Sequence, residues 1–298
     1  MASGRFSRVA RPLAGALPLV AATWGQRHGQ PASGCEAKPS CCEESKKPAF
    51  FKATCVENEA HTHDTRLITL KLPATWSEKG PVANVVVRAE IAGPSMVARP
   101  YNPLSAYSGD TVTLLVKRYG EKAQMGSKLH GLKAGETVEV KGPNQQWTLP
   151  EKGTCKHYGM VAGGTGITPI VQAAEAILKQ DSSAVVTLVT MNKTSQDVLL
   201  RKQLKFLEIQ FCGRLKVVHC VATKTNDDGT DMEGSPSVPL LSALLPKPSA
   251  TGGVMILVCG RKEMTAAVAG PKTPDFKQGD VGGMLKELGY QASQVWKF

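Results

Sequence analysis

Short apolar runs separated by turn signals dominate the chain from about residue 50 to residue 153. Four of these runs, rich in β-branched residues, are "TRLITLKLP", "NVVVRAEI", "TVTLLVKRY" and "ETVEVKG". Glycine and proline lie between the runs, as in Gly80-Pro81, Gly93-Pro94 and Gly142-Pro143. Strands at this spacing, with no helical stretch between most of them, favour an antiparallel barrel or sandwich. We therefore expect residues 50–153 to form an all-β domain.

From residue 154 onward, strand-like runs alternate with helical ones. The strand-like runs are "HYGMVAG", "AVVTLVT", "RLKVVHC" and "VMILVCG", and the helical patterns cover Pro169–Lys179, Gln196–Leu207 and a short stretch near Val238–Leu245. This alternation predicts a parallel sheet with helices on both faces, formed by residues 154–298. Ligands of such sheets bind outside the carboxyl ends of the strands. The predicted fold class is thus an antiparallel β domain followed by an α/β domain.

The first 49 residues have the composition of a targeting segment followed by a linker. The stretch from Met1 to about Gln30 is rich in Arg, Ser and Ala and contains no acidic residue, which is typical of a mitochondrial presequence. Its apolar run, Leu13 to Trp24, is 12 residues long. A membrane-spanning helix needs roughly 20 residues. A secretory signal, a short signal anchor and plain disorder remain open as alternatives.

The formal charge of +11 narrows the class of partner. Four arginines in the first 34 residues account for part of it, which leaves +7 for the rest of the chain. This remainder contains no dense Lys/Arg block and no recognisable nucleic-acid module, so we expect no nucleic-acid partner. An acidic protein partner or an anionic cofactor explains the excess of positive charge.

Eight cysteines are scattered along the chain without a paired C-x-x-C spacing or histidines at zinc-site distances. A disulfide framework and a metal site are therefore not expected. Cys35, Cys41 and Cys42 form a cluster near the N-terminus. Redox chemistry or lipid attachment there competes with the simpler interpretation of an exposed linker, which the surrounding Gly, Pro, Ser, Glu and Lys favour.

The sharpest local feature is "MVAGGTGITPI", from Met160 to Ile170, which passes from a strand directly into a helix. Thr168 is a natural N-cap and Pro169 suits the first helical position. Gly163, Gly164 and Gly166 leave backbone N–H groups open to a phosphate at the positive end of the helix. The motif lacks the G-x-G-x-x-G spacing and the lysine of a P-loop, which weakens kinase and ATPase hypotheses. A pyrophosphate site is predicted, with a tight structural turn as the alternative.

Two weaker features accompany this loop. "VCGRKEM", Val258 to Met264, ends a strand at the same sheet edge, so that Cys259 would face the cleft and Gly260 would let a ligand approach. Spacing alone favours a buried structural cysteine there. In the β domain, "ARPYNPLS" places Arg99 and Tyr101 on one face of a strand, where they could hold a phosphate and a flat ring. Without further context, a solvated Arg-Pro turn is the simpler interpretation.

At these residues the sequence resembles the ferredoxin reductase superfamily and, within it, the NADH-cytochrome b5 reductases of the mitochondrial type. The resemblance extends from Phe50 to Phe298 and rests on a series of motifs in the family's order. These are "THDTRLITLKLP", "ARPYNP", "LLVKRY", "GLKAGETVEVKGP", "HYGMVAGGTGITPIVQ", "NKTSQDVLLR", "VCGRKEM" and "QGDVGGMLKELGYQASQVWKF".

The resemblance implies an FAD-binding β-barrel (residues 50–153) followed by a nicotinamide-binding α/β domain (residues 154–298). It implies hydride transfer from NADH, or NADPH, to FAD and then single-electron transfer to cytochrome b5 or a similar acidic haem protein, with no side chain acting as general base. It also implies a monomer in mitochondria, at the outer membrane or in the intermembrane space, with N-terminal membrane association. Another acceptor, such as a quinone or ferric chelate, and a non-catalytic subunit remain alternatives.

The resemblance also assigns roles to individual residues. Asn102 and Cys259 would lie at the reacting rings, Asn102 and Tyr101 against the isoalloxazine and Cys259 beside the nicotinamide. The remaining expected cofactor contacts are Arg99 and Pro100 at a flavin phosphate, Lys117 and Tyr119 along the FAD site, Met125, Gly126 and Ser127 at the FAD pyrophosphate, Thr168 at the flavin, Gly163, Gly164, Thr165 and Gly166 at the NAD(P)H pyrophosphate, Gly260 and Met264 beside the nicotinamide, and Phe298 over the cleft.

Four departures from the family pattern affect these roles. Asn102 replaces Thr or Ser, and its amide could still donate to the flavin N5. The family's G-K-M-S is "AQMGS" here, which moves the hydroxyl to Ser127 or leaves Gly126 in its place. C-G-P-P-P-M is "CGRKEM", which adds two cations. The acid that favours NADH falls at about Ala222, with Thr223 and Lys224 after it. A missing carboxylate near cations could admit the 2′-phosphate of NADPH.

Overall fold

A computed structural model describes residues 49–73, 80–91, 96–104, 110–120, 123–225 and 230–298 of the chain. The targeting segment predicted for residues 1–49, with Cys35, Cys41 and Cys42, lies almost wholly outside these ranges. No helix among the described residues is long and apolar enough to cross a membrane.

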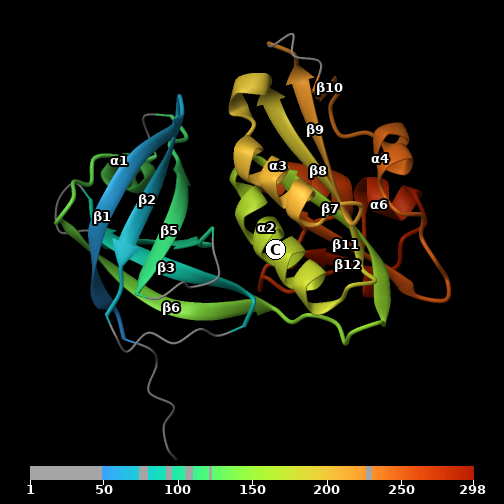
Figure 1. Ribbon diagram of the computed structural model, residues 1–298, viewed down its shortest axis with the longest axis horizontal. Coiled ribbons are helices and arrows are strands. Elements are labelled where there is room, and N and C mark those ends of the chain that lie inside the picture. The colour runs from blue at the N-terminus through green and yellow to red at the C-terminus, as the bar shows by residue number, and fades with distance from the viewer. Residues whose placement is uncertain (1–48, 74–79, 92–95, 105–109, 121–122, 226–229) are drawn as a thin grey trace, which may run out of the picture. The chain divides into compact units, whose positions relative to one another are not determined.

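The first half of the described chain is an antiparallel sheet, as predicted (Figure 1). Its strand order is β4-β3-β6-β1-β2-β5. A further antiparallel bridge joins Pro103, just after β4, to Leu114 of β5, so the two edges of the sheet meet and the barrel closes. The strands are β1 (Phe51–Thr62), β2 (Thr65–Lys71), β3 (Val82–Glu90), β4 (Met96–Tyr101), β5 (Thr111–Lys117) and β6 (Thr137–Trp147).

The barrel core comes from strand alternation. In β2, Ile68 and Leu70 are fully buried while their neighbours are partly or fully exposed, which is the period of two that a pleated strand imposes. A short helix, α1 (Gln124–His130), follows β5 and buries Met125 and Leu129 against this core. The sequence pattern did not predict α1, because seven residues are too few for a clear helical period.

The second half is a parallel sheet of order β10-β9-β8-β7-β11-β12, with helices on both faces, which confirms the predicted α/β architecture (Figure 1). Its strands are β7 (Cys155–Gly163), β8 (Val185–Thr194), β9 (Leu215–Thr223), β10 (Asp231–Glu233), β11 (Gly253–Cys259) and β12 (Val295–Lys297). Its helices are α2 (Ile167–Gln180), α3 (Arg201–Gln210), α4 (Val238–Leu244), α5 (Lys262–Ala269) and α6 (Gly283–Glu287).

Successive side chains of the central strand, β7, pack into hydrophobic cores on opposite faces of the parallel sheet. Met160 of β7 belongs to the core cluster under α2 and α3, whereas Val161 belongs to the cluster under α4, α5 and α6. Both are fully buried. Burial on both faces explains why these strands are almost continuously apolar in sequence.

Two predicted helix starts are wrong. Helix α2 begins at Ile167, with Gly166 as its N-cap, and Thr168 instead donates its hydroxyl to the Thr165 carbonyl from inside the first turn. The helix expected over Gln196–Leu207 is divided into a 3-10 turn, Ser195–Asp197, and α3. Leu200, with a φ of 59°, separates them, because a left-handed residue cannot continue a right-handed helix.

Candidate active site

Two cavities lie along the carboxyl ends of the parallel strands, where the sheet architecture places ligands. The larger, of about 900 Å³, is lined by the ends of β4 and β5, the start of α1, the loop before α2, the loop after β11 and Phe298. The smaller, of about 690 Å³, is lined by the ends of β5, β7, β8 and β9, by the turn after β1, by the loop after β10 and by the start of α5. Both cavities therefore take walls from the barrel and from the parallel sheet.

The structure brings nearly all of the predicted site residues to these walls. The larger cavity contains Arg99, Pro100, Tyr101, Asn102, Lys117, Tyr119, Met125, Gly126, Thr165, Gly166, Thr168, Cys259, Gly260 and Phe298. Gly163, Gly164 and Met264 line the smaller one, together with Lys117 and Tyr119.

Ser127 is the exception. Its side chain is exposed and lines neither cavity, whereas Gly126, one residue earlier, is buried and does. A Cβ on Gly126 would lie 3.1 Å from the Lys117 carbonyl oxygen, so the backbone there is close to β5. The motif "AQMGS" left open whether Ser127 or Gly126 takes the place of the family's hydroxyl. In the structure, Gly126 is the one that lies at the cavity.

The glycine loop packs backbone against backbone with the end of β11. A Cβ on Gly166 would lie 2.4 Å from the Cys259 carbonyl oxygen, and the Cα of Gly163 would lie 3.2 Å from a Cβ on Gly260. Gly164 has a φ of 53°, and no atom comes within 3.9 Å of the Cβ it lacks. The loop is therefore tight on the side of β11 and open above Gly164, where a phosphate could reach backbone N–H groups.

Arg99 and Tyr101 form the barrel side of the larger cavity. The Arg99 guanidinium is exposed and donates to the Ala98 carbonyl at 2.8 Å, and no carboxylate pairs with it among the described residues. Burial raises the pKa of Tyr101 to about 12, so its phenol stays neutral. An unpaired guanidinium beside a neutral ring fits the phosphate and the flat heterocycle of a flavin nucleotide.

Cys259 lies partly buried at the opposite wall. Burial raises the pKa of its thiol to about 12, despite the opposing effect of Lys272. A thiol with this pKa is protonated at neutral pH and is not a nucleophile. The side chain is therefore a small neutral group at this wall of the cavity.

Asn102 ties the barrel to α2. Its amide nitrogen lies 3.0 Å from the Ala83 carbonyl, 2.5 Å from Oε1 of Gln146 and 3.0 Å from Oε1 of Gln172. The buried Gln172 in turn donates to the Pro103 carbonyl at 2.8 Å. The two hydrogens of the amide are thus already shared among three protein acceptors. The donation to N5 expected from the sequence would have to compete with these bonds, and it stays a prediction.

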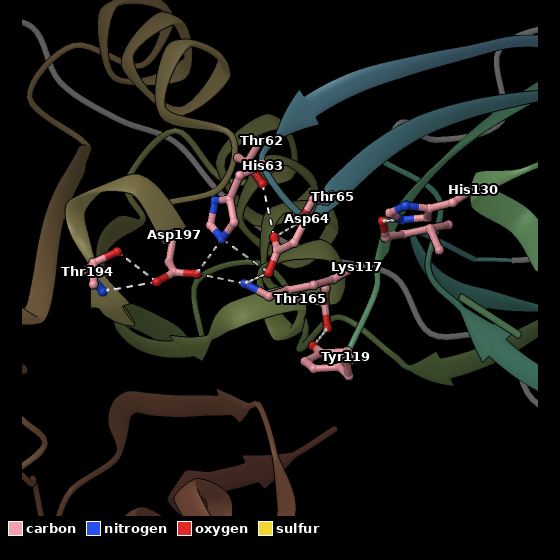
Figure 2. A network of polar contacts seen from close by, with 11 residues as sticks. Thr62, His63, Asp64, Thr65, Lys117, Tyr119, His130, Thr165, Thr194 and Asp197 are labelled. Atoms are coloured by element: carbon pink, nitrogen blue, oxygen red, sulfur yellow. Dashed lines mark hydrogen bonds and ion pairs between the residues drawn. The ribbon is translucent and has the colours of Figure 1, made fainter. Parts of the chain in front are cut away.

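Ion pairs of Lys117 form a second link between the barrel and the parallel-sheet half (Figure 2). The Lys117 ammonium lies 3.1 Å from Asp64, in the turn after β1, and 2.9 Å from Asp197, in the 3-10 turn after β8. Burial alone would raise the pKa of both aspartates, but their hydrogen bonds from Lys117 hold each pKa below its usual value. His63 lies beside the same carboxylates, 3.5 Å from Asp64. Although Lys117 borders both cavities, its charge is engaged by the protein.

A third tie joins the Tyr119 hydroxyl to the Thr165 hydroxyl at 2.7 Å (Figure 2). It links the end of β5 to the glycine loop. The sequence analysis missed the partners in these ties, namely Asp64, Asp197, Gln146 and Gln172. Their separations from Lys117 and Asn102 along the chain reach 80 residues, so no local pattern could reveal them.

Comparisons with known proteins agree with this geometry. The family model "Oxidoreductase FAD-binding domain" matches residues 52–149, and "Oxidoreductase NAD-binding domain" matches residues 160–270. NADH-cytochrome b5 reductase 2 of Phaeosphaeria nodorum is 37% identical over 257 residues, which cover 84% of this chain and 75% of that protein. The chain belongs to the NADH-cytochrome b5 reductase family. NADH-cytochrome b5 reductase 2 of Saccharomyces cerevisiae is 36% identical over 244 residues, 80% of each chain.

Solved structures support the same fold. The cytochrome b5 reductase domain of Ulva prolifera nitrate reductase superposes with a TM-score of 0.70 at 23% identity, covering 84% of this chain and 97% of that one. A ferredoxin NADP+ reductase from Neisseria gonorrhoeae, with bound FAD and NADP, gives a TM-score of 0.63 at 18% identity, covering 84% and 98%. The resemblance inferred from the motifs is confirmed. This member of the reductase family is an FAD-dependent oxidoreductase that uses a nicotinamide dinucleotide.

We predict that Lys117→Met destabilises the reductase at neutral pH by about 2 kcal/mol, between the values for exposed and buried ion pairs. Removing the ammonium leaves Asp64 and Asp197 to repel each other. In the wild type their lowered pKa values stabilise the fold above their usual value of 3.8, and this contribution is lost as the pH falls through the folded-state values. The gap between variant and wild type should therefore narrow below about pH 4. Thermal unfolding of both proteins from pH 3 to pH 8 measures this difference in stability.

Lys71→Met is the matched control, because the Lys71–Asp110 pair of the barrel is more than half exposed on both sides. That variant should unfold within about 0.5 kcal/mol of the wild type. Equal losses in both variants would show that the Lys117 pairs contribute no more than a surface pair.

Proposed function

We propose that this chain oxidises NADH and reduces cytochrome b5 or a similar small acidic haem protein. The observation that supports the proposal is the larger cavity, in which the barrel residues Arg99 and Tyr101 face Cys259 and the glycine loop of the NAD-binding half. The curated relatives at 36% and 37% identity carry the name of that activity. The excess of positive charge suits an acidic acceptor.

We assign the residues at the two cavities to binding and orienting the cofactors. Arg99 would hold the phosphate end of FAD, Tyr101 would lie against its ring system, and Gly126 would let the chain approach its pyrophosphate. Gly163, Gly164 and Gly166 would do the same for the dinucleotide. When bound, FAD accepts a hydride from the dihydronicotinamide and gives up its electrons singly.

Proton transfer by a side chain has little support in this cavity. Among the lining residues that the structure describes, none is a histidine and Glu263 is the one carboxylate side chain. Tyr101 and Cys259 both have a pKa raised to about 12 and stay neutral. The protein therefore contributes position and exclusion of water, and the cofactors contribute the reactivity.

The purified chain should be yellow and should reduce cytochrome b5 with NADH. Stopped-flow absorbance at the flavin and haem bands checks both steps in one experiment. A colourless protein that takes up no added FAD would contradict the assignment of the chain as an FAD-dependent enzyme. A yellow protein that reduces ferricyanide but no cytochrome b5 would contradict the acceptor alone.

Arg99→Ala should purify folded but poor in FAD. Loss of one charge-assisted phosphate contact costs about 1.5–3 kcal/mol, equivalent to roughly 10- to 100-fold weaker FAD binding. Equilibrium dialysis or flavin fluorescence gives the affinity. Arg88→Ala is the control, because Arg88 of β3 pairs with Glu139 and lines neither cavity. Unchanged FAD affinity in Arg99→Ala would remove Arg99 from the phosphate site.

We propose further that the smaller cavity tolerates NADPH alongside NADH. Ala222 lines it, with Lys193, Arg118 and Arg261, and the two aspartates among its described lining residues are both engaged by Lys117. Lys224, the cation suggested by the sequence, is exposed and does not line this cavity. An anionic 2′-phosphate prefers a lysine or arginine neighbour and no free carboxylate. NADH remains the preferred coenzyme by family membership.

Lys193→Glu should lower kcat/KM with NADPH about tenfold more than with NADH, because a carboxylate there repels the 2′-phosphate while a hydroxyl tolerates it. Lys224→Glu, with the same change of charge outside the cavity, should show a smaller difference. Initial rates measured with NADPH and with NADH give the two kcat/KM values for each variant. Equal losses with NADPH and NADH in Lys193→Glu would contradict this proposal.

The proposed location is mitochondrial, at the outer membrane or in the intermembrane space, with association through the N-terminus. Its support is the acid-free, arginine-containing composition of the first 34 residues. We also propose that the chain is a monomer. Fractionation of cells expressing the chain with a C-terminal tag, with and without residues 1–45, tests the location. An unchanged distribution after truncation would contradict a targeting role for the segment.

A further inference from the structure

The segment Pro271–Asp280, between α5 and α6, is fastened to the last strand by an unusual residue. Lys297 is 1% exposed, and its ammonium donates to the carbonyls of Pro271, at 3.1 Å, and Asp280, at 3.0 Å. Its backbone N–H and carbonyl both bond the Gln278 side chain, at 2.7 and 2.9 Å. Burying an ammonium without a paired carboxylate is costly. The arrangement fixes both ends of this segment, which we name the Phe276 loop.

The tip of the Phe276 loop exposes a large apolar side chain. Phe276 is 76% exposed and has a φ of 62°, a conformation that L-residues seldom adopt. Bonds within the turn hold it there, from Phe276 N–H to the Thr273 carbonyl at 2.9 Å and from Thr273 N–H to the Lys277 carbonyl at 3.1 Å. Residues held in a strained backbone conformation are often found at contact sites, and Phe276 also lines the cavity beside it.

A cationic cavity of about 340 Å³ lies behind the tip. Lys272, Lys277 and Lys297 line it, and no carboxylate side chain of the described residues does. The loop's own carboxylates lie outside its lining, and one of them, Asp275, pairs with Lys277 at 2.7 Å. Trp296 also lines the cavity, and its indole N–H is the one buried side-chain polar atom without a partner among the described residues. Lysines and a free N–H complement acidic groups.

This cavity adjoins the cofactor site. Phe298 and Gln146 line both it and the larger cavity. Lys272 lies near enough to Cys259 to oppose the rise that burial causes in the pKa of its thiol. The Phe298 ring is held against Trp147, edge to face at 6.4 Å. A molecule bound at the Phe276 loop would therefore lie one layer of side chains from the proposed flavin.

We propose that the Phe276 loop is the docking element for the acidic protein that takes electrons from this reductase. The Phe276 ring would contact an apolar patch of the partner, and Lys272 and Lys277 would take the partner's carboxylates, while the buried Lys297 holds the loop in place. This inference rests on the proposed function. The charge of the cavity lining favours an acidic protein over a second copy of this basic chain, whose like charge would be repelled.

The test uses the full chain with bound FAD and compares two acceptors, cytochrome b5 and ferricyanide. Phe276→Asn removes the ring, and asparagine tolerates the left-handed backbone. It should lower kcat/KM for cytochrome b5 about tenfold, as for a central aromatic contact, and leave NADH:ferricyanide activity and FAD content unchanged. Phe206→Gln is the matched control, because Phe206 of α3 is 64% exposed and lines none of the three cavities.

A charge pair of variants gives a second measurement. Lys277→Glu should weaken cytochrome b5 reduction at low salt and flatten its dependence on ionic strength, because steering by charge is screened by salt. Lys202→Glu makes the same change on the exposed side of α3 and should have a smaller effect.

The outcomes separate the two proposals. If the wild type reduces ferricyanide but not cytochrome b5, the proposed acceptor is wrong, and the docking proposal that depends on it is wrong as well. A wild type that reduces cytochrome b5 with the same kcat/KM as Phe276→Asn and Lys277→Glu overturns the docking element alone. A dimer that becomes a monomer in Phe276→Asn, as seen by sedimentation velocity, would assign the loop to a second copy of the chain instead.

Discussion

The Lys117 ammonium neutralises carboxylates that come from both halves of the chain, and the cavities depend on it. Asp64 belongs to the barrel and Asp197 to the parallel sheet, and without the cation their charges would repel across the boundary. The Asn102–Gln172 and Tyr119–Thr165 bonds act at the same boundary. Each cavity takes walls from both halves. The polar ties therefore set the spacing at which two cofactors can meet.

Within that frame, the reactive end of the site is built mostly from backbone. Gly166 lies so close to the Cys259 carbonyl that a side chain has no room there, and at Gly126 a Cβ would be tight against the carbonyl of Lys117. Cys259 and Tyr101 are kept neutral by burial. An enzyme whose cofactors carry the reaction needs such close, uncharged walls more than it needs acids and bases. Arg261 and Lys262, at the larger cavity, add positive charge where the family pattern has rigid prolines.

The Phe276 loop concentrates features that cost stability: a buried ammonium, a left-handed phenylalanine and an exposed ring. Marginally stable proteins seldom keep such costs together without a use. Phe298 lines both the larger cavity and the cavity behind the loop, so under our proposal the electrons would leave on this side. The coenzyme, by contrast, would enter at the smaller cavity, near Lys193 and Ala222. The two events would thus use different sides of the same centre.

The amino-acid sequence was enough to predict the two sheets and their strand directions, because strand spacing and the alternation of strand-like and helical runs are local signals. The family came from the resemblance of a series of motifs in the family's order. The sequence also named Arg99, Tyr101 and Cys259, which all line the larger cavity. It placed the start of α2 two residues late, and it named Met125, Gly126 and Ser127 together, of which Met125 and Gly126 line the larger cavity and Ser127 does not. Only the tertiary structure decided that the Lys117 charge is engaged by Asp64 and Asp197, that Asn102 bonds Gln172, and that Lys297 is buried. These contacts join residues far apart in the chain, and their energies depend on burial, which no local pattern records.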